Sequence, residues 1–198
     1  MGVIIGYKEG GRVYLATDTQ RAISSYYYSD ATETGLNVFC FANGILCGAT
    51  NYLIKQLLKT KEHWFDELGE KPLTKEFIVT TIVPQLYGCL EAENLILEQS
   101  IEDGASCFDG AILLAQGDRL FCIDEDFSVI SIARYCVIGD GIDFANVPLH
   151  QYSGTVPVPA LLYKTLRAVN RFTRNVCAPY CLFTTDSDEM IELRGEDK

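Results

Sequence analysis

The sequence has few basic residues, and they are never grouped. Among 198 residues, 16 are Lys or Arg and 27 are Asp or Glu, which gives a formal charge of −11. Nucleic acids and anionic membranes are bound through clusters of basic side chains that displace counterions. We therefore expect neither a nucleic acid nor a membrane as a partner.

Patterns of metal-binding side chains are also missing. The two histidines, His63 and His150, lie far apart and there is no CxxC pair. Zinc sites need three or four such ligands, so we expect no metal and no cofactor. The cysteines lie in or beside apolar stretches, which is typical of reduced core residues and not of a disulfide framework. They are Cys40, Cys47, Cys89, Cys107, Cys122, Cys136, Cys177 and Cys181.

Long apolar runs of the kind that cross a bilayer are absent as well. A predicted strand begins at residue 2 or 3 and leaves no room for a signal peptide, so we expect a cytoplasmic protein. With 48% hydrophobic and 22% charged residues, a chain of this length is the size of one domain. We assign residues 1–194 to that domain and residues 195–198 to a frayed tail.

Two hairpins open the chain. Apolar residues 3–7 and 13–16 flank a Lys-Glu-Gly-Gly turn, and the second strand ends in Thr17 and Asp18. If the strands pair in register, the Asp18 carboxylate lies beside the start of the first strand. Residues 36–41 and 45–49 form the second hairpin, in which Asn43-Gly44 predicts a type I′ turn.

The pattern then changes from strands to helices and back. A 3.6-residue period predicts a helix over 53–68, with Leu53 among its buried residues. The same period predicts a second helix over 74–97, which is kinked at Pro84 and whose last buried residue is Leu97. Strands follow at 110–116, 120–124 and 128–138, then a short helix after Gly141, a helix over 160–172 with Phe172 facing inward, and strands at 180–184 and 189–193. Groups of strands that are separated from groups of helices along the chain indicate an α+β fold. Two stacked antiparallel sheets flanked by helix pairs, a four-layer αββα sandwich, would bury every apolar stripe.

Four segments, in this order and at this spacing, resemble the proteasome β-subunit and HslV branch of the N-terminal nucleophile (Ntn) hydrolases. They are residues 13–20, 44–50, 137–141 and 181–186. The resemblance covers nearly the whole chain and implies the same αββα sandwich. It also implies threonine-type peptidase chemistry and assembly into rings.

An Ntn hydrolase attacks with the side chain of an N-terminal Thr, Ser or Cys, while its free amino group takes the proton. Alignment places Gly2, which has no side chain, at that position, and Asp18 at the position of the family aspartate. The family lysine would fall near Leu36 or Asn37, yet no Lys or Arg occurs between residues 21 and 55. In the later Ile-Gly-Ser-Gly turn, Asp140 replaces the serine and Gly141 follows. The predicted site residues are therefore Gly2, Asp18, Asp140 and Gly141.

Two functional hypotheses follow. In the first, the protein is a proteasome- or HslV-like pseudoenzyme that acts in assembly or binding, as a homo-oligomeric ring or dimer. Tyrosines 26–28 would pack in its contacts, and the cleft between the sheets would accept a peptide or small molecule. The alternative is an active threonine-type peptidase or amidohydrolase with an unrecognised nucleophile, for which Thr17, Thr19 and Cys40 are candidates. If Asp18 and Asp140 approach each other, their like charges would attract a cation.

Overall fold

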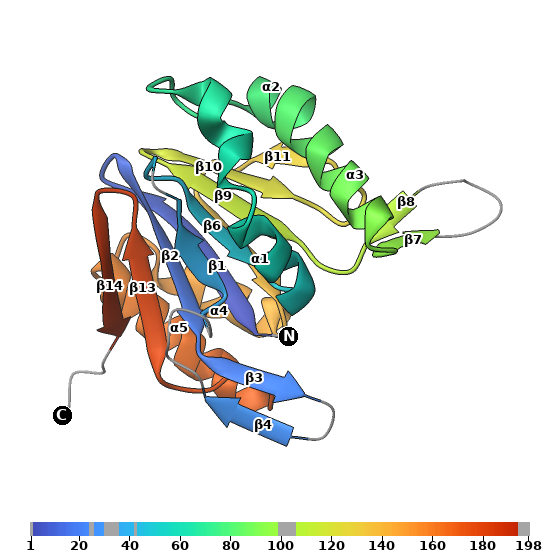
Figure 1. Cartoon of the computed structure of the whole chain (residues 1–198). Coiled ribbons are helices and arrows are strands. Elements are labelled where there is room, and N and C mark those ends of the chain that lie inside the picture. Colours follow the sequence, from blue (N-terminus) through green and yellow to red (C-terminus); the bar gives the residue numbers. More distant parts are fainter. Residues whose placement is uncertain (1, 24–25, 30–35, 42, 99–105, 194–198) are drawn as a thin grey trace.

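Two five-stranded antiparallel sheets lie face to face, and helices cover the outer side of each (Figure 1). This computed structural model describes residues 2–23, 26–29, 36–41, 43–98 and 106–193. The order of layers is α, β, β, α, which confirms the sandwich that the sequence predicts.

The first sheet has the strand order β12-β1-β2-β13-β14. Its strands are β1 (Val3–Glu9), β2 (Arg12–Asp18), β12 (Tyr135–Gly139), β13 (Tyr180–Thr184) and β14 (Ser187–Leu193). Gly10 and Gly11, at φ of 64° and 78°, close the β1–β2 hairpin, and this left-handed conformation matches the twist of the two strands. The register pairs Ile4 with Thr17, so Asp18 lies next to the start of β1.

The second sheet has the order β11-β10-β9-β6-β5. Its strands are β5 (Val38–Cys40), β6 (Leu46–Ala49), β9 (Ile112–Gln116), β10 (Arg119–Ile123) and β11 (Val129–Ser131). Between β5 and β6, the Phe41 amide donates to the Ile45 carbonyl and the Gly44 amide to the Phe41 carbonyl. The loop therefore holds three residues between the closing pair, with Gly44 left-handed, and is not the two-residue type I′ turn predicted.

The helices fall into two layers. Over the second sheet lie α1 (Tyr52–Lys59), a 3₁₀ helix (Glu62–Leu68), α2 (Lys75–Phe77), a π-helical turn (Ile78–Ile82) and α3 (Val83–Ala92); over the first lie α4 (Ile142–Tyr152) and α5 (Val158–Phe172). Asn51 caps α1, since its Oδ1 accepts from the amides of Leu53 and Ile54. The π-helical turn comes immediately before Pro84, where the sequence predicts a kink. None of these helices combines the length and the apolar character that crossing a bilayer requires, within the residues described.

Two small hairpins complete the described chain. β3 (Gln20–Ile23) pairs with β4 (Tyr26–Ser29), and β7 (Ile96–Glu98) pairs with β8 (Ser106–Phe108). The tyrosines at 26–28 therefore lie in a strand, although their side chains are outside the described part of the structure.

Three apolar clusters hold the layers together. One lies between the two sheets and includes Ile4, Leu15, Leu46 and Leu113. The other two lie between each sheet and its helices, around Leu86 in one and Leu166 in the other. Burial of such side chains contributes about 1.5–3 kcal/mol each, so the interlocking of three cores stabilises the whole sandwich.

Besides the turn at Asn43-Gly44, four sequence predictions are wrong in detail. Leu53 and Phe172 were expected inside but are 53% and 66% exposed, and Leu97 lies in β7 because the second helix ends at Ala92. Residues 128–138 form two strands in different sheets, β11 and β12. The apolar pattern of the sequence does not show where an element ends or which of its apolar side chains stay exposed.

Candidate functional site

Gly2 and Asp18 lie together where β1 begins and β2 ends. The Val3 amide donates to Asp18 Oδ1 at 3.0 Å, and the Asp18 side chain is fully buried. A buried carboxylate that accepts a backbone N–H is held in one orientation. This hydrogen bond therefore fixes the Asp18 carboxylate against residue 2.

The space beside Gly2 is already filled. A Cβ atom built on Gly2 would lie 2.4 Å from Asp18 Oδ1 and 2.7 Å from Asn37 Nδ2. Carbon atoms normally approach such groups no closer than about 3.5 Å. A Thr, Ser or Cys side chain at residue 2 therefore requires the Asp18 and Asn37 side chains to move.

Gly139 and Asp140 close the site from the neighbouring strand. β12 pairs with β1 so that Val3 lies opposite Gly139, and the Asp140 amide donates to the Gly2 carbonyl at 3.1 Å. Gly139 has φ of 91°, and a Cβ there would lie 2.1 Å from the Gly2 oxygen. Only glycine permits this approach of two backbones.

Gly141 lies one step further along the chain and begins α4. It is the left-handed N-cap residue, its carbonyl accepts from the Phe144 and Ala145 amides, and a Cβ there would lie 2.4 Å from Val169 Cγ1 of α5. Its contacts are with the helices. Gly2, Asp18 and Asp140 thus come together around residue 2, whereas the described contacts of Gly141 place it at the helix start.

The three alternative nucleophiles differ in their surroundings, and the two threonines are buried. The buried Thr17 hydroxyl donates to the Val3 carbonyl at 2.9 Å, and Thr19 is also buried. Cys40 is exposed on the edge strand β5, with Sγ directed to the Phe41 carbonyl. A buried hydroxyl bonded to backbone cannot reach a substrate without local opening.

Thiols near Asp18 are kept protonated. Burial, Glu192 and Asp18 raise the pKa of Cys181 to about 11, and burial together with Asp18 raises the pKa of Cys177. The thiolate is the nucleophilic form of cysteine, so neither residue is activated at neutral pH.

Two site residues were missed by sequence reasoning. Asn37 is half-buried, and its amide nitrogen is 3.5 Å from Thr17 Oγ1 as well as close to Gly2. Thr50 accepts from the Ala111 amide at 3.1 Å, and its Cγ2 is 3.0 Å from the Cβ position of Gly139. The resemblance had marked residue 37 only as the place of a missing lysine, and nothing in the pattern around Thr50 separates it from an ordinary helix-start residue.

A cleft of about 390 Å³ lies next to this site, between the edges of the two sheets. Thr50, Gly139 and Asp140 are among its lining residues, and the others come from β10, β11 and β12, from the loops beside these strands and before β9, and from the start of α4. Within the described residues, no group of three His, Cys, Asp or Glu side chains is arranged to hold a metal ion. The cation suggested for Asp18 and Asp140 thus has no ligand cluster in that part of the chain.

The αββα order of layers is the fold found in HslV-like structures. The chain is similar to Thiobacillus denitrificans BPH, free and in complex with epoxomicin, with TM-scores of 0.70 and 0.69, 17% identity, and coverage of 98% of this chain and 100% of that one. It is also similar to eukaryotic HslV from Trypanosoma brucei, with a TM-score of 0.65, 12% identity, and coverage of 92% of this chain and 98% of that one. The predicted resemblance is thereby confirmed for the fold. No protein-family model matches the sequence, and no curated protein is similar to it.

Proposed function

We propose that this chain is a non-catalytic protein with the HslV-like fold, which acts through assembly or binding and not through peptide hydrolysis. The observation that carries the proposal is the filled space at Gly2. Asp18 Oδ1 and Asn37 Nδ2 lie within 2.7 Å of the point where a nucleophilic side chain would begin. Attack on a carbonyl needs both the nucleophilic atom and room for the substrate beside it.

Asn37 supports the same conclusion. In the resemblance, residue 36 or 37 is the position of the lysine that assists the nucleophile. An amide lies there in this chain, and an amide neither carries a positive charge nor transfers a proton at neutral pH. The nucleophile and its assisting cation are therefore replaced together.

Epoxomicin provides a direct test, because it forms a complex with T. denitrificans BPH. The purified chain would be incubated with epoxomicin and with fluorogenic peptides, beside BPH as the positive control. We expect no mass adduct and no peptide hydrolysis. An epoxomicin adduct at the N-terminal residue, or hydrolysis abolished by Asp18→Asn, would overturn the proposal.

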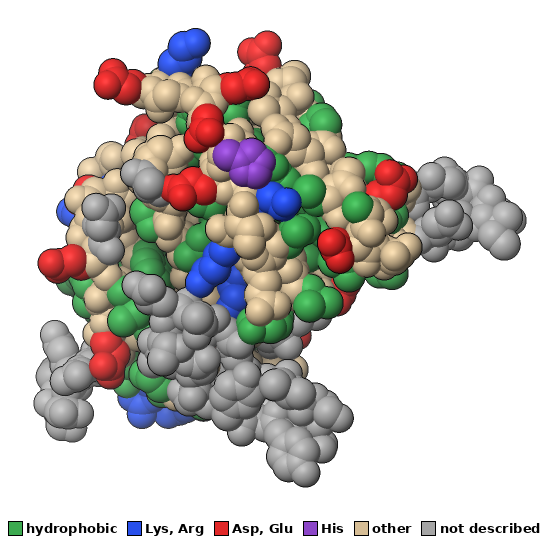
Figure 2. Space-filling view, in the orientation of Figure 1, with side chains coloured by type: hydrophobic (Ala, Val, Ile, Leu, Met, Phe, Trp, Pro, Cys, Tyr) green, Lys and Arg blue, Asp and Glu red, His purple; other side chains and the backbone are tan. Residues whose placement is uncertain are grey.

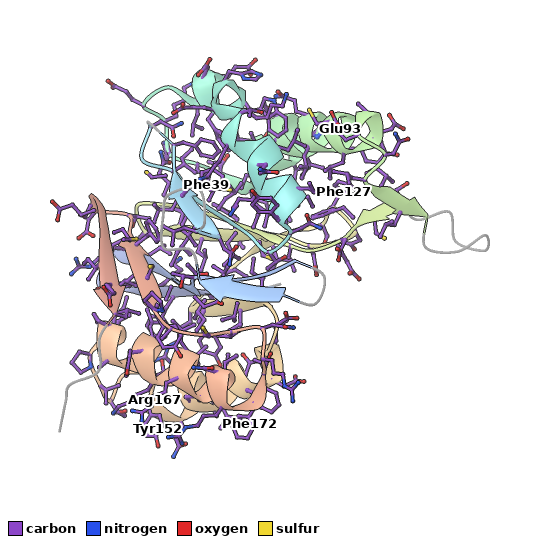
Figure 3. All side chains as sticks on the ribbon, turned by 60° about the horizontal axis from the view of Figure 1, so that its bottom comes forward. Phe39, Glu93, Phe127, Tyr152, Arg167 and Phe172 are labelled. Atoms are coloured by element: carbon purple, nitrogen blue, oxygen red, sulfur yellow. The ribbon has the colours of Figure 1, made fainter. Side chains whose placement is uncertain are left out.

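For the assembly role we propose that the outer face of α4 and α5 binds a second copy of this chain. Phe144, Val147 and Phe172 are exposed there around a groove of about 560 Å³, and Phe144 stacks on Phe172 with ring centroids 4.7 Å apart. Exposed apolar patches of this kind are typical of protein interfaces. Figure 3 shows Tyr152, Arg167 and Phe172 on the outer side of this layer.

Charge favours a second copy as the occupant. The α5 helix carries Lys164, Arg167 and Arg171, whereas the chain as a whole has a charge of −11. The opposite helical layer carries exposed Glu62, Asp66, Glu67, Glu70 and Glu76 together with Lys59, Lys61, Lys71 and Lys75, and Figure 2 shows acidic and basic side chains mixed on the surface. A basic apolar face on one copy is attracted by the net negative charge of a second copy, and a contact between unlike faces generates rings.

Size-exclusion chromatography with light scattering tests this contact. We expect an oligomer that dissociates with Val147→Glu and weakens at high salt, while Met190→Glu, the same kind of change at an exposed residue of β14, leaves it intact. A monomer for the unmodified protein, or equal effects of the two variants, would refute it.

A further inference from the structure

Two cysteines from different sheets line the same cleft. Cys122 lies on β10 of the second sheet and Cys136 on β12 of the first, and both are lining residues of the 390 Å³ cleft. Cys122 is buried and Cys136 is half-exposed. Both thiols are free in the structure.

A glycine brings the sheets together at this point. Gly6 of β1 pairs with Cys136, and a Cβ on Gly6 would lie 2.9 Å from Leu120 Cδ2 of β10. Cα atoms of β1 and β10 come within 8 Å of one another, closer than the roughly 10 Å that usually separates stacked sheets. Leu120 and Cys122 are two residues apart, so they point to the same face of their strand. Cys122 therefore points toward the first sheet, into the inter-sheet core against which Cys136 packs.

We propose that Cys122 and Cys136 form a peroxide-reactive thiol pair, in which Cys136 is oxidised first and Cys122 then closes a disulfide between the two sheets. The Cys136 thiolate attacks one oxygen of a hydroperoxide, the O–O bond breaks, and the second oxygen leaves as hydroxide or alkoxide, which takes up a proton. Cys136 is then a sulfenic acid. The Cys122 sulfur attacks the Cys136 sulfur, the S–O bond breaks, and the Cys122 proton and the departing hydroxide leave as water. The peroxide is reduced by two electrons and the pair of thiols is oxidised by two.

The surroundings of the two thiols set the order of reaction. A hydrogen bond with Cys122 lowers the pKa of Cys136, against the opposing effects of burial and the Asp124 carboxylate. The same hydrogen bond, together with burial, raises the pKa of Cys122. The half-exposed thiol is thus the better nucleophile, and its buried neighbour stays protonated until the sulfenic acid forms. Reactive thiols with a resolving cysteine beside them share this arrangement.

The cleft selects the oxidant by charge. Asp109, Asp124, Glu125 and Asp140 line it, and among its described lining residues there is no Lys, Arg or His. Negative charge in a confined cleft repels anionic reagents. Hydrogen peroxide and small alkyl hydroperoxides are neutral, so the cleft favours them over an anionic disulfide such as oxidised glutathione.

The test uses the full chain with Cys40→Ser and Cys177→Ser, which remove an exposed and a half-exposed thiol elsewhere. After brief treatment with hydrogen peroxide and quenching with N-ethylmaleimide, intact mass and peptide mapping are measured. We expect a loss of two hydrogen atoms and a linked peptide containing Cys122 and Cys136. A folded protein without this linked peptide would overturn the proposal.

Two single variants test the order of reaction. In C122S the sulfenic acid has no resolving thiol, so dimedone should label Cys136, whereas in C136S it should leave Cys122 unlabelled. Equal labelling in both, or labelling only of Cys122, contradicts the assignment.

Cys136 should also react with neutral N-ethylmaleimide at least about tenfold faster, relative to a free thiol standard, than with anionic 5,5′-dithiobis(2-nitrobenzoate). Equal relative rates would refute the selection of neutral oxidants.

Discussion

Gly2→Ala adds one carbon atom at the centre of the candidate site, and its effect on stability follows from the distances there. The new Cβ would lie 2.4 Å from Asp18 Oδ1 and 2.7 Å from Asn37 Nδ2, so both side chains must move by about 1 Å to restore ordinary contact. Asp18 is held by the Val3 amide, and the Gly2 carbonyl by the Asp140 amide. Neither strand can shift without losing a hydrogen bond.

Overpacking of this kind costs about 1–3 kcal/mol. For a chain of this size, each kcal/mol lowers the melting temperature by about 2–4 °C. We therefore expect Gly2→Ala to melt about 2–12 °C below the unmodified protein. Urea denaturation followed by tryptophan fluorescence gives an independent measure, because Trp64 is buried in the core.

Gly88→Ala is the matched control. Gly88 lies in α3 with nothing within 4 Å of its Cβ position, so the same added carbon should stabilise the helix by about 0.5–1 kcal/mol. Combining Gly2→Ala with Asn37→Ala should recover part of the loss, with a coupling energy of about 0.5 kcal/mol or more. If Gly2→Ala proves as stable as the unmodified protein, residue 2 has room for a side chain and the argument for a filled site is wrong.

Three further predictions concern other parts of the chain. Asn51→Ala removes the cap of α1 and should cost about 0.5–2 kcal/mol, measured by urea denaturation. Gly139→Ala places a Cβ 2.1 Å from the Gly2 carbonyl oxygen at a left-handed φ, and should leave no folded protein by circular dichroism. Cys122→Ala removes the hydrogen bond that lowers the pKa of Cys136, so maleimide labelling of Cys136 should require a higher pH; Cys122→Ser, which keeps a donor, should change it less. An unchanged pH profile in Cys122→Ala would contradict the described interaction.

The layer order could be predicted because each strand and helix carries its own apolar period, and few arrangements bury all of them. Asp18 could also be placed, since strand register follows from the turn at Gly10 and Gly11. The position of Asn37 beside Gly2 could not be predicted from the strand pattern. The two residues lie next to strands of different sheets, and the pattern does not show how one sheet is stacked on the other. The exposure of Phe172 was missed for a related reason, since an apolar period does not distinguish a core from an interface.

The packing at residue 2 also decides which substitutions could introduce a nucleophilic side chain there. Gly2→Thr alone would place its Cβ against both Asp18 and Asn37, so a nucleophile cannot enter unless a neighbour changes with it. Asn37→Lys alone would put a longer cation into space that Gly2, Thr17 and Asp18 now share. The obstacle to a side chain at residue 2 is thus shared between Asp18 and Asn37, and a change at one of them leaves the other in place. Residues 2, 18 and 37 therefore share one packed space, so a side chain added at residue 2 requires a change in its neighbours.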